Sequence, residues 1–120
     1  MSFRIAAKQA KKSLHHQHKL GAVIVKGSRI LAVGYNSLRP SSLLGTHTLH
    51  AEAAAVLKLL KARRLSDLAG AEMYVTRFTR GGAVGIARPC HDCQRLLASV
   101  GIRSVHYSTD TSHVETMKFD

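Results

Sequence analysis

The chain has 120 residues, of which 45% are hydrophobic and 21% are charged, and 18 lysines and arginines against seven acidic residues give a formal net charge of +11. A chain of this length forms one domain around a single core, so two independently folding domains are excluded and we expect one domain over residues 1–120. The longest apolar runs are far shorter than the ~20 residues that cross a bilayer, so no membrane-spanning helix is expected.

Two features of the sequence bear on the cell compartment. Residues 1–12 carry four basic side chains, but neither an apolar segment nor a small-residue cleavage site follows them, which argues against secretion. The two cysteines, Cys90 and Cys93, are separated by two residues, and this spacing without a signal peptide is more typical of a metal or redox site than of a structural disulfide. We therefore expect an intracellular, cytoplasmic protein.

The positive charge is concentrated in the first half of the chain. Residues 1–64 hold 12 of the basic residues and one acidic residue, Glu52, whereas residues 65–120 hold six of each kind. Such an excess attracts partners that carry phosphate, either free nucleotides or nucleic acid, although a solvated charged surface gives the same pattern. The chain has no Trp and only three Tyr and three Phe, so it offers few of the stacking platforms that hold single strands.

Apolar periodicity and turn residues predict alternating helices and strands. Gly27 and Ser28 join two runs rich in β-branched residues, a two-residue connection typical of a β-hairpin. The histidines at 15, 16 and 18 could bind a metal, but a polar helix end is the more common explanation, and we assign them no role. In chain order, we predict a helix over 2–15, strands over 20–26 and 29–35, a polar loop over 36–47, a helix over 50–64, a strand over 72–79, a flexible glycine-rich loop over 80–88, a helix over 90–100, and strands over 102–108 and 113–119.

Two short motifs open the second and third predicted helices. Cys90 and Cys93, three residues apart in a first helical turn, can point the same way, and the helix N-terminus favours the thiolate form. His50 supplies a third ligand from the neighbouring helix and leaves one coordination position open for water, as catalytic zinc requires. Glu52 then remains free to handle protons.

The pairing of His50-x-Glu52 with Pro89-Cys90-x-x-Cys93 resembles the signature of the cytidine/deoxycytidylate deaminase superfamily, whose members are zinc-dependent nucleobase deaminases. The segments 21–25 and 30–36 are similar to the first hairpin of that family, and the order of elements agrees over most of the chain. The resemblance implies a three-layer α/β/α fold with a mixed five-stranded sheet between helices. The short connection before the final strand predicts that the last two strands pair antiparallel.

The resemblance also implies a reaction and its residues. Zn²⁺ held by His50, Cys90 and Cys93 would lower the pKa of a water toward ~7, and the family removes an exocyclic amine from a nucleobase by hydrolysis. Glu52 would take the proton of that water, pass it to the ring nitrogen and help ammonia leave. In the family, an asparagine at the position of Asn36 contacts the sugar, and the backbone amide at the position of Ala51 helps hold the base.

Two other readings of the cysteine pair remain at this point. A thioredoxin-like redox protein places its Cys-x-x-Cys early and needs a later proline, whereas only 27 residues follow Cys93 and none is proline. A structural zinc module would leave Glu52 dispensable and would need a fourth protein ligand. His91 is the nearest candidate, but its place in the motif directs it around the helix from Cys90.

The resemblance leaves the base and its carrier open. Family members act on free cytidine or deoxycytidine, deoxycytidylate, guanine, adenosine in tRNA, or cytosine in nucleic acid. The tRNA adenosine branch carries small residues after its cysteine motif, and Gln94, Arg95 and Leu96 depart from that pattern, so we favour a cytosine ring.

The short segment between the last two predicted strands favours the branch that acts on free nucleosides, while the net charge favours a phosphate. Arg39 in the loop after Asn36, or Arg77, Arg80 and Arg88 near the cysteines, would suit that phosphate. We expect a free (deoxy)cytidine or its monophosphate as substrate. The alternative is a cytosine deaminase acting on single-stranded DNA or RNA, with residues 80–88 in the strand groove. Relatives of this size assemble into dimers or tetramers, so a homo-oligomer is expected.

Overall fold

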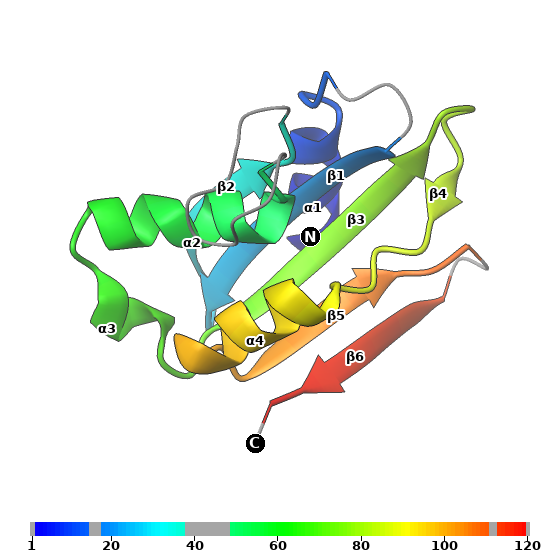
Figure 1. Ribbon diagram of the computed structural model, residues 1–120. Helices are drawn as coiled ribbons and strands as arrows, with labels where there is room; N and C mark the ends of the chain where they lie inside the picture. The colour runs from blue at the N-terminus through cyan, green and yellow to red at the C-terminus, as the bar shows by residue number, and fades with distance from the viewer. Residues whose placement is uncertain (1, 15–17, 38–48, 111–112, 120) are drawn as a thin grey trace.

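The structure, a computed structural model, describes residues 2–14, 18–37, 49–110 and 113–119 (Figure 1). Its elements follow the alternation that the sequence predicts. In chain order they are α1 (Ser2–Ala10), β1 (His18–Lys26), β2 (Arg29–Tyr35), α2 (Ala51–Lys61), α3 (Leu65–Leu68), β3 (Glu72–Thr79), β4 (Val84–Gly85), α4 (His91–Ser99), β5 (Ser104–Ser108) and β6 (Val114–Lys118). Within those residues, no helix has the length and hydrophobicity needed to cross a membrane.

The strands form one mixed sheet with the order β2-β1-β3-β5-β6. β3 and β5 are parallel, and the pairs β1–β2, β1–β3 and β5–β6 are antiparallel, so the predicted pairing of the last two strands is confirmed. The two-residue strand β4 lies off this path and pairs with the end of β3 at Arg77 and Phe78. The five main strands therefore match the predicted five-stranded mixed sheet, and β4 is an addition to it.

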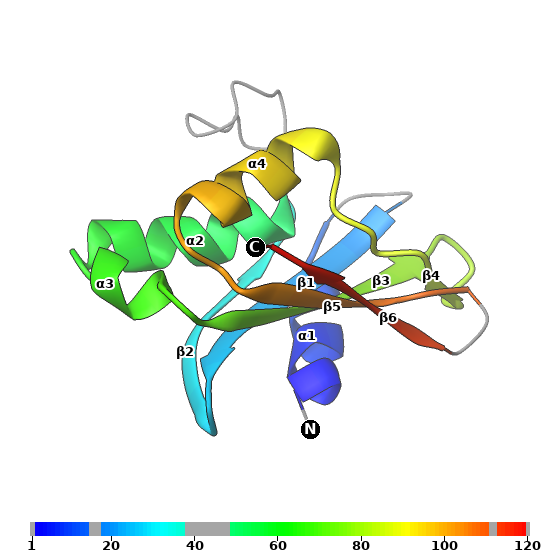
Figure 2. The same cartoon turned by 90° about the horizontal axis from the view of Figure 1, so that it is seen from below.

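Helices cover both faces of the sheet and complete the three layers of the predicted fold. Figure 2 shows α1 on one face and α2, α3 and α4 on the other. Residues 21–25 of β1 are buried because this strand lies between β2 and β3 and is covered by helices on both sides. This position explains why the strand is a continuous apolar run instead of an alternating one.

Most of the core lies between the sheet and the layer of α2, α3 and α4. It includes Ile24, Leu59, Met73, Leu97 and Val105, all of which are fully buried or nearly so. A smaller cluster under α1 joins Ala6 to Val23 and Val25. The larger core fixes α2 and α4 on the same face of the sheet, and these are the helices whose first turns carry the two sequence motifs.

The structure corrects two predicted helix ends and one predicted loop. The first helix ends at Ala10 instead of continuing to residue 15, because the backbone turns there and Ser13 donates its amide hydrogen to the carbonyl of Ala10. The second helix ends at Lys61 and is followed by the short α3. The glycine-rich segment 80–88 was predicted to be a flexible loop, but it contains β4, whose two residues form ladder pairs with β3.

Candidate functional site

The candidate site lies where the first turns of α2 and α4 meet. His50 is the N-cap residue of α2, with an extended backbone, and its carbonyl accepts the amide hydrogen of Ala54. Cys90 is the N-cap residue of α4, and its Sγ accepts the amide hydrogen of Cys93 at 3.5 Å. The caps of two separate helices therefore present an imidazole and two thiols to one another.

A glycine on β2 sets how closely α2 approaches the sheet. A Cβ atom at Gly34 would lie 2.6 Å from the amide nitrogen of Ala55 and 2.7 Å from the carbonyl oxygen of Ala51. Both atoms belong to the helix backbone, so only a residue without a side chain permits this packing. The first turn of α2, which follows His50 and contains Glu52, owes its position to this contact.

The side chains of His50, Cys90 and Cys93 converge as the sequence predicts. Nδ1 of His50 lies 3.3 Å from Sγ of Cys93 and 3.7 Å from Sγ of Cys90, and the three donor atoms all fall within 4.8 Å of one another. Tetrahedral zinc with ordinary Zn–N and Zn–S bonds separates its ligands by roughly 3.5–3.8 Å. One nitrogen and two sulfurs at these distances fit three of the four ligands of Zn²⁺.

No further group joins this set in the part of the chain that the structure describes, where His50, Cys90 and Cys93 form the one cluster suited to a metal. His91 is exposed and does not belong to it. A closed structural zinc site would need a fourth ligand. Among the described residues, the cluster therefore supplies three of the four ligands of a tetrahedral zinc site.

Burial dominates the electrostatics of the inner thiol. Cys93 is fully buried, and loss of hydration raises the pKa of its thiol, with smaller contributions from the negative charges of Glu52 and Cys90. The expectation that the helix N-terminus favours the thiolate is therefore outweighed at Cys93 by the apolar surroundings. A coordinating cation deprotonates a thiol outright, so Zn²⁺ bound at this cluster would hold Cys93 as the thiolate.

A cavity of about 380 Å³ opens beside the donor cluster. Glu52 lines it, although its side chain is only 3% exposed overall, and Oε1 has no hydrogen-bond partner among the residues that the structure describes. Burial raises the pKa of Glu52, while its own backbone amide and the nearby His50 act in the opposite direction. A buried, unpaired carboxylate is costly to a fold and is found where it has a chemical task.

Asn36 and Ala51 also line the cavity, but they do so in different ways. The side chain of Asn36 joins the backbone of β1: Oδ1 accepts the amide hydrogen of Leu20 at 2.9 Å, and Nδ2 donates to the carbonyl of His18 at 2.8 Å. One Nδ2 hydrogen remains for a ligand. Ala51 is the first residue of α2, so its amide hydrogen has no partner within the helix and is available to the cavity.

The remaining candidates divide into those in the cavity wall and those away from it. Arg77 and Arg88 line the cavity, whereas Arg80 does not belong to its wall. Arg39 lies outside the described residues. Sequence reasoning assigned no role to His18, and it overlooked Leu20 and Ile86, which also line the cavity. His18 carried a signal as one of three neighbouring histidines, but nothing in the sequence tied it to the cysteines.

Sequence comparison relates the chain to a known family. The model of the family "Cytidine and deoxycytidylate deaminase zinc-binding region" matches residues 1–109. The deoxycytidylate deaminase of Mycobacterium phage D29 is 30% identical to this chain, and the match covers 89% of this chain and 91% of that protein. The ComE operon protein 2 of Bacillus subtilis is 32% identical over 76% of this chain and 48% of its own length.

Comparison with solved structures shows that the fold is shared as well. The dCMP deaminase of the cyanophage S-TIM5 in apo form superposes with a TM-score of 0.66 at 27% identity, covering 90% of this chain and 79% of that one. A cytidine deaminase from Burkholderia pseudomallei gives a TM-score of 0.71 at 20% identity, covering 98% and 89%, and shares the fold. The family model matches nearly the whole length of the chain, so the chain belongs to the cytidine and deoxycytidylate deaminase family.

Proposed function

We propose that the protein hydrolyses the exocyclic amine from the cytosine base of a free cytidine or deoxycytidine, or of its monophosphate. The products are the corresponding uracil compound and ammonia, so one water is consumed for each amine released. The observation that carries this proposal is the convergence of His50, Cys90 and Cys93 on one cavity beside the buried carboxylate of Glu52, whose Oε1 has no partner among the described residues.

The residues of the cavity divide the chemistry between them. Zn²⁺ bound by the His50, Cys90 and Cys93 set would lower the pKa of a water to about 7 and so provide a nucleophile at neutral pH. Glu52 would take the first proton of the water and pass it to the ring nitrogen of cytosine, and would then carry the second proton from the added hydroxyl to the departing amine, which leaves as ammonia. Its buried Oε1, unpaired in the described part of the protein, leaves the carboxylate free to exchange protons with a substrate.

Binding groups beside Glu52 orient the base and sugar in this proposal. The amide hydrogen of Ala51 points from the start of α2 and donates to the base, and the unused Nδ2 hydrogen of Asn36 donates to a sugar hydroxyl. A cavity of about 380 Å³ suits one nucleoside or nucleotide. A structure of the S-TIM5 enzyme in complex with dCMP and dUMP, 25% identical to this chain, supports a free pyrimidine nucleotide as the substrate class.

The test is a mass-spectrometric deamination panel with the zinc-loaded wild type and Glu52→Ala. The substrates are cytidine, deoxycytidine, CMP, dCMP, and single-stranded DNA and RNA, each at two salt concentrations. The proposal expects turnover of small substrates by the wild type and none by Glu52→Ala, with zinc content equal in both proteins. The net charge of +11 is the observation that favours a strand substrate. Conversion confined to strands and weakened by salt would replace the proposal with a nucleic-acid deaminase.

A further inference from the structure

The lining of the cavity contains cationic side chains beside the zinc ligands and Glu52. Arg77 and Arg88 belong to this lining together with His18, and Glu52 is the only acidic side chain among the described residues of the lining. Because Glu52 is buried and the two arginines are not, their guanidinium groups give the cavity a positive charge. We propose that Arg77, assisted by Arg88, binds the 5′-phosphate of the substrate and thereby selects nucleotides over nucleosides.

The position of Arg77 on the sheet directs its side chain into the cavity. It lies near the end of β3, paired with Leu20 of β1 on one side and with Gly85 of β4 on the other. Both ladders hold its backbone, and its amide hydrogen is donated to Oγ of Ser108 at 3.2 Å. The rigid sheet therefore carries the guanidinium, so little backbone entropy is lost when an anion is bound.

The guanidinium of Arg77 is held across the cavity wall. Nη1 donates to the carbonyl of Ile86 at 3.3 Å, and Nη2 lies within hydrogen-bond distance of Nδ1 of His18. A guanidinium has five N–H groups, so hydrogens on both terminal nitrogens stay available. Nε is buried and finds no partner within the described parts of the chain. A small rotation toward a phosphate would give this nitrogen an acceptor, and the planar fork suits two phosphate oxygens.

Arg88 is oriented by a chain of hydrogen bonds from the edge of the sheet. Its Nη1 donates to the hydroxyl of Tyr107 at 3.4 Å, and that hydroxyl donates to Oε2 of Glu115 on β6 at 2.8 Å. The first of these bonds is long, so Arg88 can leave it for a stronger acceptor. Tyr107 and Glu115 are thus positioning residues that keep the second cation near the cavity without neutralising it by direct contact.

If Arg77 only linked β1 to the segment after β4, its loss would have a different effect from the loss of a phosphate contact. Loss of a structural link lowers the stability of the fold and weakens the binding of every ligand alike. Loss of a phosphate contact weakens only ligands that carry the phosphate. The ratio of affinities for a nucleotide and its nucleoside therefore separates the two roles.

The experiment is calorimetric binding of dUMP and deoxyuridine, the expected products, to the zinc-loaded protein. It rests on the proposed function for its choice of base but does not require turnover. The wild type should bind dUMP about 10- to 100-fold more tightly than deoxyuridine, the range expected for charge-assisted hydrogen bonds. Arg77→Gln should bring this ratio close to one, and Arg77→Lys, which keeps the charge but not the fork, should give an intermediate value.

The matched control is Arg29→Gln, which removes the same charge. Arg29 is exposed and pairs with Lys26 at the opposite end of β1 from His18, away from the cavity wall. This variant should keep the wild-type ratio. If Arg77→Gln fails to fold, as judged by its thermal transition and zinc content, Arg88→Gln is used in the same assay and should also lower the ratio.

Four outcomes would overturn the assignment in distinguishable ways. Equal binding of dUMP and deoxyuridine by the wild type rejects the phosphate site and leaves the deaminase proposal intact. An unchanged preference in folded Arg77→Gln rejects the role of Arg77. Tighter binding of a deoxyuridine-containing oligonucleotide than of dUMP rejects a free 5′-phosphate as the ligand. Absence of binding by either small ligand rejects the site and the proposed function together.

Discussion

Nδ1 of His50 lies 3.3 Å from Sγ of Cys93, although 43 positions separate the two residues in the sequence. The contact joins the first turn of α2 to the first turn of α4, and few other contacts cross between these two helices. A metal ion bound by both side chains would join these two turns more strongly than the thiol–imidazole contact does alone. Zinc binding is therefore expected to contribute to folding as well as to chemistry.

The first prediction concerns this coupling. Cys93→Ala should lose bound zinc and lower the thermal transition by at least about 10 °C, since several kcal/mol of metal-linked stability are removed from a small domain. Zinc content by atomic emission and calorimetry of the same samples measure both effects. His91→Ala is the matched control, because His91 is exposed and lies in the same motif outside the donor cluster. Full zinc occupancy in Cys93→Ala would show that the ligand set is different.

Replacement of Glu52 is expected to lower the rate of turnover without lowering the stability of the fold. Glu52→Gln keeps the shape of the side chain but cannot accept the proton, so kcat should fall by at least about 10³-fold. The same change removes a buried carboxylate whose Oε1 is unpaired among the described residues, so the unfolding transition should stay where it is or rise. Steady-state kinetics measure kcat and thermal denaturation measures the unfolding transition, both with zinc present. A folded, zinc-bound variant with turnover near that of the wild type would remove Glu52 from the mechanism.

The local signals in the sequence account for most of the elements but not for how they meet. The strand over 72–79 is predicted at its observed ends, because a run rich in β-branched and aromatic residues is bounded by Gly70 and Gly81. The first helix is overestimated, since its periodic pattern continues into Leu14, which the structure leaves 83% exposed. β4 is missed because two residues within a glycine-rich segment carry no period of their own.

The site shows the same division between motif and tertiary contact. His50, Glu52, Cys90 and Cys93 could be predicted because each motif opens a helix and the residue types together suit zinc. The attachment of Asn36 to β1 lies within the predicted hairpin, but the family resemblance gave Asn36 only a sugar contact. The pairing of Arg77 with His18 joins β3 to β1, which are far apart in the sequence and adjacent only in the folded sheet, so His18 received no role.

Gly34 offers a test of how the sheet positions the site. Gly34→Ala would drive a methyl group into the backbone of α2 at Ala51 and Ala55, so the helix must shift outward. We expect a loss of about 1–3 kcal/mol in the free energy of unfolding, typical of overpacking, and weaker zinc binding because His50 moves with α2. Urea denaturation and competition with a zinc chelator measure the two effects. Gly81→Ala is the control, since no atom lies within 4 Å of a Cβ there. Equal effects of the two substitutions would contradict the proposed constraint.

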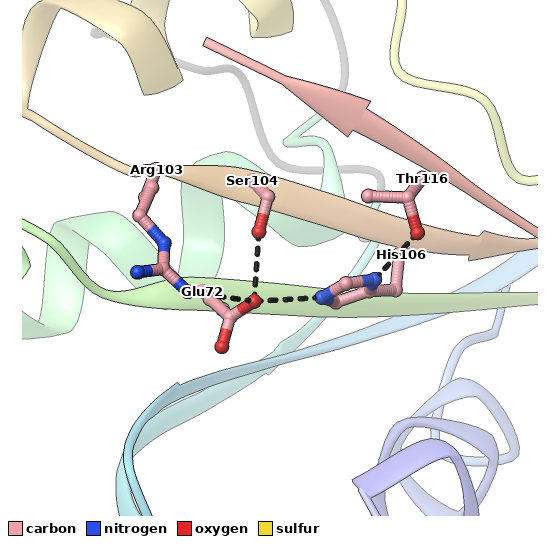
Figure 3. A network of polar contacts seen from close by, with 5 residues as sticks. All are labelled: Glu72, Arg103, Ser104, His106 and Thr116. Carbon is pink, nitrogen blue, oxygen red and sulfur yellow. Dashed lines mark hydrogen bonds and ion pairs between the residues drawn. The ribbon is translucent and has the colours of Figure 1, made fainter. Parts of the chain in front are cut away.

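A polar network on three strands gives the fold a defined acid sensitivity. Figure 3 shows Glu72 of β3 between Ser104 and His106 of β5, with Arg103 nearby and His106 reaching Thr116 on β6. Oε1 of Glu72 accepts from Ser104 Oγ at 2.8 Å and lies 2.9 Å from Nε2 of His106. These hydrogen bonds, that of His106 first, lower the pKa of Glu72. The carboxylate form is therefore favoured in the folded protein.

The sign of the resulting pH dependence follows from that direction. A carboxyl whose pKa is lower in the folded state adds stability above its unfolded pKa of about 4.3, and this stability is lost as pH falls through the folded value. Glu72→Gln should therefore cost roughly 1 kcal/mol at pH 7, a modest value because the site is partly exposed. The difference from wild type should vanish below about pH 3, which urea denaturation across pH 7 to 3 would detect. Ser104→Ala keeps the carboxylate and removes one hydrogen bond, so the pH dependence of its stability should lie between those of the wild type and Glu72→Gln. Parallel stability curves for wild type and Glu72→Gln would mean that the network does not hold the charged form, and that β3 and β5 are joined by their backbone ladder and apolar packing alone.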